Sequence, residues 1–428
     1  MSKLERELYY LFMFFYPFAH FFIIPKSPVL LFKFCIGLLL ILVFFLQLVK
    51  KTRRFAKEII ILITLVLFLY SYRIYFSSEF SYGIYLAIEL VFFSFFLIFV
   101  ASYLKWDDEY LKKGLDFFVY GVFVCTLGGL IYKVGLLPRP EFFSKYASNS
   151  HIKDYIMVIG FSSSIEDASF FRGVSLVWLL YRILNKSTCH RNLKQVLFWF
   201  LLSIVLYYVM FFGHGRSGLV LFIIYCTILS FYKNKAIFAF VVFATSIYLL
   251  LAPNVTRVSL LNFNGSFYQL DKISSGRALA YAYAFKFIST DPLWGLGATN
   301  GFVNAAGGIK STSILSDVAL SSAPSEYREK EILGRSLTQG PANDFILYFA
   351  EGGAVLFAIF SGIWIWLLAK SRRSIVKGLY DARAFVFSAL IVANISGGIF
   401  FSLQSHLVMW IIVLILILKN PKWIIYKI

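Results

Sequence analysis

Apolar runs of about twenty residues recur along the whole chain, and a run of that length is what a helix needs to cross a bilayer. Hydrophobic side chains make up 60% of the 428 residues and charged ones only 15%, which is more apolar surface than one water-soluble core can hide. The pattern predicts an all-α integral membrane protein with about twelve transmembrane helices. The runs begin near Leu8, Val29, Ile59, Gly83, Leu115, Ala168, Val196, Ser217, Ala236, Asn343, Arg383 and Leu403.

Lysines and arginines cluster in alternate loops between these runs, as they do in loops that face the cytoplasm. This distribution accounts for the net charge of +19 without nucleic acid as a partner, and it predicts that both termini are cytoplasmic. The first run, from Leu8 to Ile24, has no small-residue cleavage site before Pro25, so we expect it to remain as a helix. The clusters centre on Lys50–Lys57, Lys105–Lys113, Lys186–Lys194, Lys233–Lys235 and Lys370–Lys377.

One connection on the outer side is far longer than a turn requires. It runs over about ninety residues, from 253 to 342, and separates helices 1–9 (residues 1–252) from helices 10–12 (residues 343–428). A helical stretch from Ser274 to Ser289, ended by Asp291 and Pro292, predicts that this loop is partly folded against the membrane domain. The four cysteines show no metal-ligand spacing, so no metal and no cofactor is expected.

Four cations fall at the outer ends of predicted helices, against the pattern of the loops. For Arg73 and Lys133 we expect the side chains to snorkel to the outer headgroups, whereas for Arg172 snorkelling and substrate binding stay equally open. Arg216 lies in the glycine-rich turn Gly213–Gly218 at a helix start. Free backbone N–H groups and the helix dipole there would add to the guanidinium, which suits a phosphate or pyrophosphate. A simple turn is the alternative.

Arg277 repeats this arrangement in the first turn of the loop helix, after two serines. An exposed structural arginine is the alternative reading there. Trp294 follows in a Trp-Gly-Leu-Gly turn, where its indole could stack on a sugar face. His214, beside Arg216, could act as a base near neutral pH.

A polar group stands where the large loop re-enters the membrane. Asn343 and Asp344 open the next helix, and Glu351 follows two turns later, so all three could line a cavity at the outer interface. A carboxylate inside a membrane span must have a partner or face water. For Glu351 a structural ion pair with an outer arginine is the alternative to a catalytic role. Glu89 is a weaker candidate of the same kind.

These motifs, in this order, resemble the bacterial O-antigen ligases and polymerases. The family pattern has an arginine at a helix start, then a loop with Gly-Arg before Pro-x-x-Gly-x-Gly, then His-Asn and Glu-x-Gly at the next span. Here it corresponds to Arg216, Gly276-Arg277, Pro292–Gly297, Asn343 and Glu351–Gly353, over roughly residues 211 to 360. The ligases carry a catalytic histidine before that asparagine, and this chain has Ala342, which favours a polymerase.

The resemblance implies a glycosyltransferase of the Wzy polymerase type in the bacterial inner membrane, with a lipid-donor (GT-C-like) architecture. Such an enzyme joins undecaprenyl-pyrophosphate-linked oligosaccharides at the periplasmic face, and a membrane chain-length regulator is a possible partner. Arg216 and Arg277 would stabilise the pyrophosphate leaving group, and Asp344, Glu351 or His214 would accept the acceptor proton. Arg172, Asn343 and Trp294 would contact substrate. A ligase of the same family and a flippase for lipid-linked oligosaccharides are the alternatives.

Overall fold

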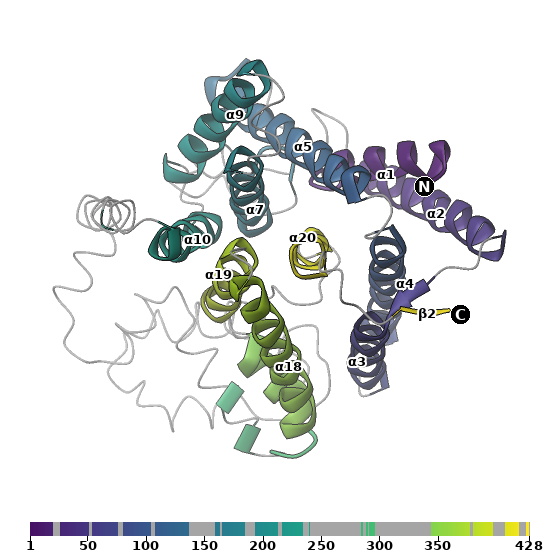
Figure 1. The fold of residues 1–428 in the computed structure, drawn as a ribbon. Helices are drawn as coiled ribbons and strands as arrows, with labels where there is room; N and C mark the ends of the chain where they lie inside the picture. The colour runs from purple at the N-terminus through teal and green to yellow at the C-terminus, as the bar shows by residue number, and fades with distance from the viewer. Residues whose placement is uncertain are drawn as a thin grey trace, which may run out of the picture.

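In the computed structural model, the described residues form a bundle of eleven helices and one pair of short strands (Figure 1). The structure describes residues 1–19, 26–50, 54–75, 80–103, 108–136, 159–162, 165–184, 193–212, 216–233, 239, 284–285, 288–289, 291–295, 344–376, 380–396, 407–418 and 425–427. The helices are α1 (Lys3–Phe15), α2 (Lys26–Lys50), α3 (Lys57–Tyr75), α4 (Phe80–Tyr103), α5 (Asp108–Val134), α7 (Ile165–Leu184), α9 (Leu193–Phe212), α10 (Arg216–Lys233), α18 (Asp344–Val376), α19 (Tyr380–Ser396) and α20 (Leu407–Leu418). The strands are β1 (Arg54–Ala56) and β2 (Ile425–Lys427).

The apolar helices confirm the class of an α-helical membrane protein. Four of them are long and apolar enough to cross a bilayer, and another four are apolar but shorter. A described helix lies at each predicted run except the one near Ala236, which falls almost wholly outside the described residues. The four long segments are Pro28–Gln47, Leu86–Tyr103, Glu109–Val134 and Phe345–Arg372.

Helix α1 is shorter than the run that predicts it. It begins with a capping box in which Ser2 and Glu5 bond to each other's backbone N–H groups, and it ends at Phe15 rather than near Ile24. Pro17 has no N–H for a further helical bond, so the chain turns there. The turn is held by a hydrogen bond from the Ala19 N–H to the carbonyl of Phe161.

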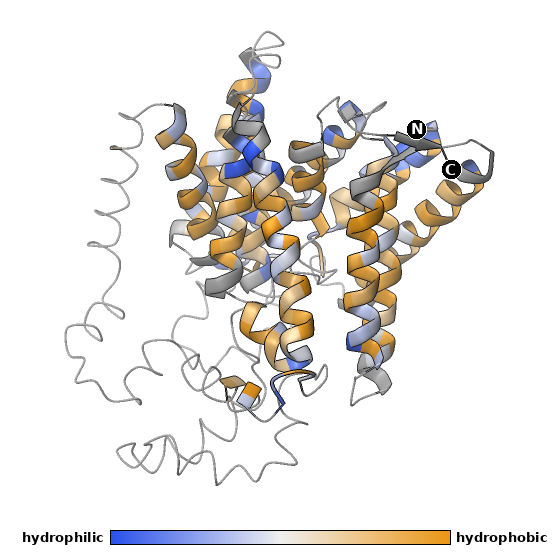
Figure 2. Ribbon diagram, turned by 60° about the horizontal axis from the view of Figure 1, so that its bottom comes forward, coloured by the Kyte–Doolittle hydropathy of each residue, from blue (hydrophilic) through white to orange (hydrophobic). Residues whose placement is uncertain are grey.

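Both marked chain ends lie at one end of the bundle, where hydrophilic residues also gather (Figure 2). The Tyr103 hydroxyl at the end of α4 donates to Glu5 over 2.6 Å, and β2 pairs antiparallel with β1 in the connection between α2 and α3. We call this the terminal end and the other the opposite end. The basic connection at Lys50–Lys57 and both marked chain ends therefore share one end, an arrangement that the charge pattern predicts.

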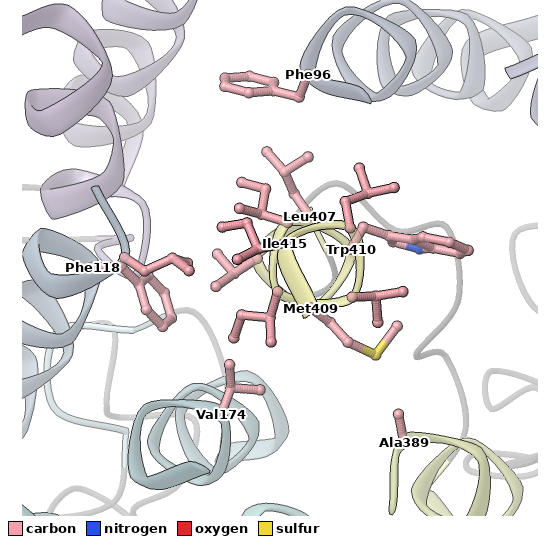
Figure 3. Packing of buried hydrophobic residues seen from close by; sticks show 14 of the residues in the cluster. Phe96, Phe118, Val174, Ala389, Leu407, Met409, Trp410 and Ile415 are labelled. Atoms are coloured by element: carbon pink, nitrogen blue, oxygen red, sulfur yellow. The ribbon is translucent and has the colours of Figure 1, made fainter. Parts of the chain in front are cut away.

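Helix α20 forms the centre of the bundle. Its residues 407–415 are all buried, and side chains of α4, α5, α7 and α19 surround it, among them Phe96, Phe118, Val174 and Ala389 (Figure 3). All twelve of its residues are apolar. Between helices in a bilayer, close packing of such side chains provides the attraction, because lipid tails are equally apolar.

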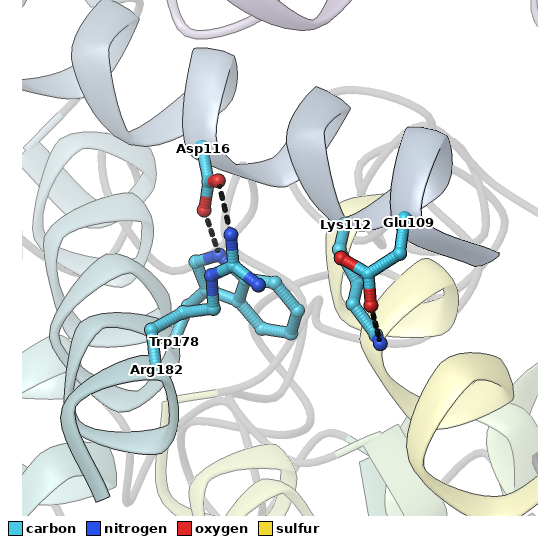
Figure 4. A network of polar contacts seen from close by, with 5 residues as sticks. All are labelled: Glu109, Lys112, Asp116, Trp178 and Arg182. Atoms are coloured by element: carbon cyan, nitrogen blue, oxygen red, sulfur yellow. Dashed lines mark hydrogen bonds and ion pairs between the residues drawn. The ribbon is translucent and has the colours of Figure 1, made fainter. Parts of the chain in front are cut away.

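A polar network joins α5 to α7 (Figure 4). Asp116 accepts a hydrogen bond from the Trp178 indole over 2.9 Å and pairs with Arg182 over 2.8 Å. The Arg182 guanidinium also lies over the rings of Trp178 and Trp199, at 5.9 and 5.3 Å from their centroids. The buried carboxylate thus has a cation and a second donor, which offsets the free energy lost when it leaves water.

Candidate functional site at the opposite end of the bundle

An ion pair joins α3 to α18 near the opposite end. The Arg73 Nε lies 2.9 Å from the Glu351 Oε2, and Nη2 lies 3.4 Å from Oε1, so the contact is two-pronged. Both side chains are buried, and the guanidinium lies 5.3 Å from the centre of the Tyr348 ring. Arg73 therefore does not snorkel, contrary to our expectation. Its partner is the carboxylate of Glu351, the ion-pair alternative considered for that residue.

Helix α18 breaks directly after Glu351. Gly352 has φ −132° and ψ 16°, and Gly353 has φ 58° and ψ −155°, a combination that only glycine adopts readily. Because the helix is broken, the Ala354 N–H does not bond to the carbonyl four residues before it. It donates instead to the carbonyl of Pro292 over 2.9 Å. A buried backbone donor needs such a partner when its helical one is lost.

The partner belongs to a turn from the large loop, Asp291–Gly295. Within the turn the Trp294 N–H donates to the Asp291 carboxylate and the Gly295 N–H to the Asp291 carbonyl. From α3 the Tyr72 hydroxyl donates to the Trp294 carbonyl over 2.7 Å. We call this contact of residues 291–295 with Gly352–Ala354 the turn–break junction.

Two glycines allow the backbones at the junction to touch. A Cβ atom on Gly353 would lie 2.3 Å from the carbonyl of Leu293, and one on Gly295 would lie 2.5 Å from the backbone nitrogen of Gly353. Gly295 also has φ 73°, in the left-handed region. Neither position has room for a larger residue unless the two segments separate. The Trp294 indole, about half exposed, extends from this fixed backbone.

Helices α7 and α10 also meet through glycines. A Cβ on Gly173 would lie 2.5 Å from the Cα of Gly218, and the Gly218 N–H donates to the Ser169 hydroxyl over 3.0 Å. Gly218 is in the first turn of α10, so one of the N–H groups expected to be free for an anion is already bonded. Arg172 lies beside this crossing on α7. It is 1% exposed, and its Nε donates to the Thr126 hydroxyl of α5 over 2.9 Å.

The structure places some of the predicted site residues and not others. Arg216 begins α10 and Asp344 begins α18, both at helix starts as predicted, although the structure does not describe their side chains. The other three, together with the side chain of Glu89, lie outside the described residues. They are His214, Arg277 and Asn343.

The structure gives partners to two buried charged groups, Asp116 and Arg73, that the sequence does not predict. The sequence motifs give no role to Asp116, although an aspartate inside a long apolar run is by itself a signal of a buried polar contact. Arg73 was assigned to the headgroups, because nothing in its own neighbourhood indicates a partner 278 positions away. Such a pair becomes visible only when α3 and α18 are side by side.

The described part of the site brings distant segments together at the opposite end of the bundle. The turn from the large loop, the broken helix that carries Glu351 and the end of α3 form one unit that fixes where the loop meets the membrane domain. Comparisons with protein-family models and with curated proteins found no match to this chain.

Proposed function

We propose that this membrane protein is a polysaccharide polymerase, a glycosyltransferase that joins undecaprenyl-pyrophosphate-linked oligosaccharide units. The turn–break junction is the observation that supports the proposal most directly. It joins the Pro-Leu-Trp-Gly turn to the Glu-Gly-Gly segment, two motifs that are more than fifty residues apart and that both belong to the resemblance with the O-antigen polymerases. Motifs of one active site are expected to converge in this way.

The chemistry requires an anion site and a proton acceptor on the same side of the membrane. As the glycan leaves its lipid pyrophosphate, negative charge grows on the leaving group, which Arg216 and Arg277 would stabilise. Asp344 begins α18 and would accept the proton of the attacking hydroxyl. In this scheme Glu351 positions the helix through Arg73, and His214 and Asn343 complete the polar surroundings.

In the proposed orientation the terminal end faces the cytoplasm of a bacterial inner membrane, and the opposite end faces the periplasm. About twelve helices in a GT-C-like arrangement would then carry the large loop over the outer ends of α3 and α18. Trp294, with its half-exposed indole, would offer a flat apolar face to a sugar ring. No cofactor is part of the scheme, and a chain-length regulator is a possible partner within the membrane.

A lipid-linked oligosaccharide flippase is the main rival. Alternating access moves two comparable halves against each other around a central site. The turn–break junction instead ties one loop to α3 and α18 at a single end of the bundle, which fits a fixed reaction site better than a rocking one. A ligase of the same family is the other alternative, and Ala342 at the position of its catalytic histidine argues against it.

Reconstitution tests the proposal. The purified protein is placed in liposomes with a synthetic undecaprenyl-pyrophosphate oligosaccharide and no nucleotide sugar, and the products are analysed by mass spectrometry. A ladder of multiples of the unit is expected. Arg216→Ala and Arg277→Ala should abolish it, whereas Arg372→Ala, an exposed arginine at the terminal end of α18, should not. Transport of the unit across the bilayer without extension would favour the flippase instead.

A further inference from the structure

Two arginines of the described helices, Arg73 and Arg172, are buried, and Arg182 is largely buried. Arg73 and Arg182 each have a carboxylate partner. Arg73 pairs with Glu351 and Arg182 pairs with Asp116. Among the residues that the structure describes, no carboxylate pairs with Arg172, which is the most deeply buried of the three. Among these described residues, its positive charge is therefore not compensated by a neighbouring carboxylate, in contrast to those of Arg73 and Arg182.

The surroundings of Arg172 also leave one of its donors without an acceptor. The side chain lies about two turns inside α7 and points to α5, where its Nε donates to Thr126. Thr126 in turn donates to the carbonyl of Val122. The Nη1 of Arg172 is buried and has no hydrogen-bond partner.

A second unpaired polar atom lies one turn further along the same helix. The hydroxyl of Ser175 is fully buried and likewise has no hydrogen-bond partner. Residues three apart on a helix lie on neighbouring positions of one face, so Ser175 lies next to Arg172 on the same side of α7. Both can donate a hydrogen bond, and both lack an acceptor.

An unpaired guanidinium inside a membrane protein is strongly disfavoured unless something supplies the opposite charge. The Arg172 side chain does not reach the lipid headgroups, because it is buried in the bundle and bonded to Thr126 of α5. Snorkelling therefore does not return its charge to water. The adjacent start of α10, in contact through Gly173 and Gly218, adds the positive end of a helix dipole and no negative charge. A bound anion would account for the uncompensated charge of Arg172, for its unbonded Nη1 and for the unbonded hydroxyl of Ser175.

We propose that Arg172, assisted by Ser175, binds the phosphate oxygens of a membrane-borne ligand, a polyprenyl phosphate or pyrophosphate. A planar guanidinium and a hydroxyl match the tetrahedral oxygens of a phosphate ester. This inference rests on the proposed function for the identity of the lipid, while the site itself rests on the unpaired groups. The headgroup of an anionic phospholipid presents the same chemistry, so the test separates the two sources.

The test measures thermal unfolding and binding for the full chain in nanodiscs of phosphatidylcholine. Farnesyl pyrophosphate should raise the melting temperature of the wild type, and it should raise that of Arg172→Met much less. Losing a charge-assisted contact should weaken binding about tenfold or more in Arg172→Met, and by less in Ser175→Ala. Without ligand, Arg172→Met should melt at or above the wild-type temperature, because an uncompensated buried charge is gone.

Arg182→Met is the matched control. It strands the Asp116 carboxylate and should lower the melting temperature without ligand. If Arg172→Met is destabilised in the same way, or if it binds farnesyl pyrophosphate like the wild type, the proposed site is wrong. If nanodiscs with phosphatidylglycerol give the full shift and farnesyl pyrophosphate adds nothing, the ligand is a phospholipid and the assignment to a polyprenyl carrier is overturned.

The outcome is separable from that of the polymerase assay. Binding that depends on Arg172 without any glycan extension would retain the anion site and refute the polymerase. Glycan ladders of wild-type length and rate from Arg172→Met would retain the polymerase and refute the role of Arg172 in holding its substrate.

Discussion

Replacing Gly353 with alanine should detach the turn of the large loop from α18. The new Cβ would lie 2.3 Å from the Leu293 carbonyl, and the backbone angles at this position are nearly exclusive to glycine. The strained angles cost about 1–3 kcal/mol, and the overlap costs about the same again. Two hydrogen bonds between loop and helices, from Ala354 and Tyr72, contribute only about 1 kcal/mol each. The clash therefore exceeds what holds the turn in place.

Hydrogen exchange measured by mass spectrometry reports this detachment directly. The amide of Ala354 is bonded to Pro292 in the junction, and a loss of about 2 kcal/mol should speed its exchange by roughly thirtyfold. Gly362→Ala is the control on the same helix, because a Cβ there meets no atom within 4 Å. It should stabilise α18 by up to about 1 kcal/mol. Unchanged exchange at Ala354 in Gly353→Ala would refute the reasoning.

Three further outcomes are expected. Arg73→Met or Glu351→Met alone should lower the free energy of unfolding by about 3–5 kcal/mol, because each leaves a buried charge without its partner. The double variant should recover most of this loss in thermal unfolding. Additive losses would mean that the two residues are not coupled. Gly218→Ala should lower stability by about 1–3 kcal/mol, as its Cβ would overlap the carbonyl of Ser169, whereas Gly362→Ala should not lower it. A cysteine at Lys427 should react with a membrane-impermeant maleimide only from the cytoplasmic side of oriented vesicles, and labelling from the periplasmic side would reverse the proposed orientation.

Periodicity and charge were sufficient to predict the helical class, because both are carried by short stretches of sequence. The starts of α10 at Arg216 and of α18 at Asp344 follow from local signals of the same kind. The end of α1 was misplaced, since hydropathy continues past Phe15 while Pro17 and the contact with Phe161 turn the chain. Hydropathy indicates which residues prefer lipid, but it does not indicate where a helix ends and the chain turns.

The contacts of the candidate site could not be predicted in this way. The Trp-Gly turn and the Glu-Gly-Gly segment were each noted, but only the structure shows that one docks into the break of the other. Pairing of Arg73 with Glu351 depends on two helices far apart in the sequence. That Arg172 lacks an acceptor cannot be read from its own helix, because the atoms around it come from α5 and α10 as well as from α7.

The central position of α20 has a consequence for biogenesis. Helix α20 contacts α4, α5, α18 and α19, which all precede it in the chain. During synthesis these surrounding helices are therefore made before the helix that packs between them. With twelve residues, α20 spans about 18 Å, too short to be a stable membrane span alone. We therefore expect the earlier helices to close around this position only after α20 has entered between them. Final closure of the membrane domain is then a late, post-insertion event, and a chaperone or the insertion machinery could act at this step.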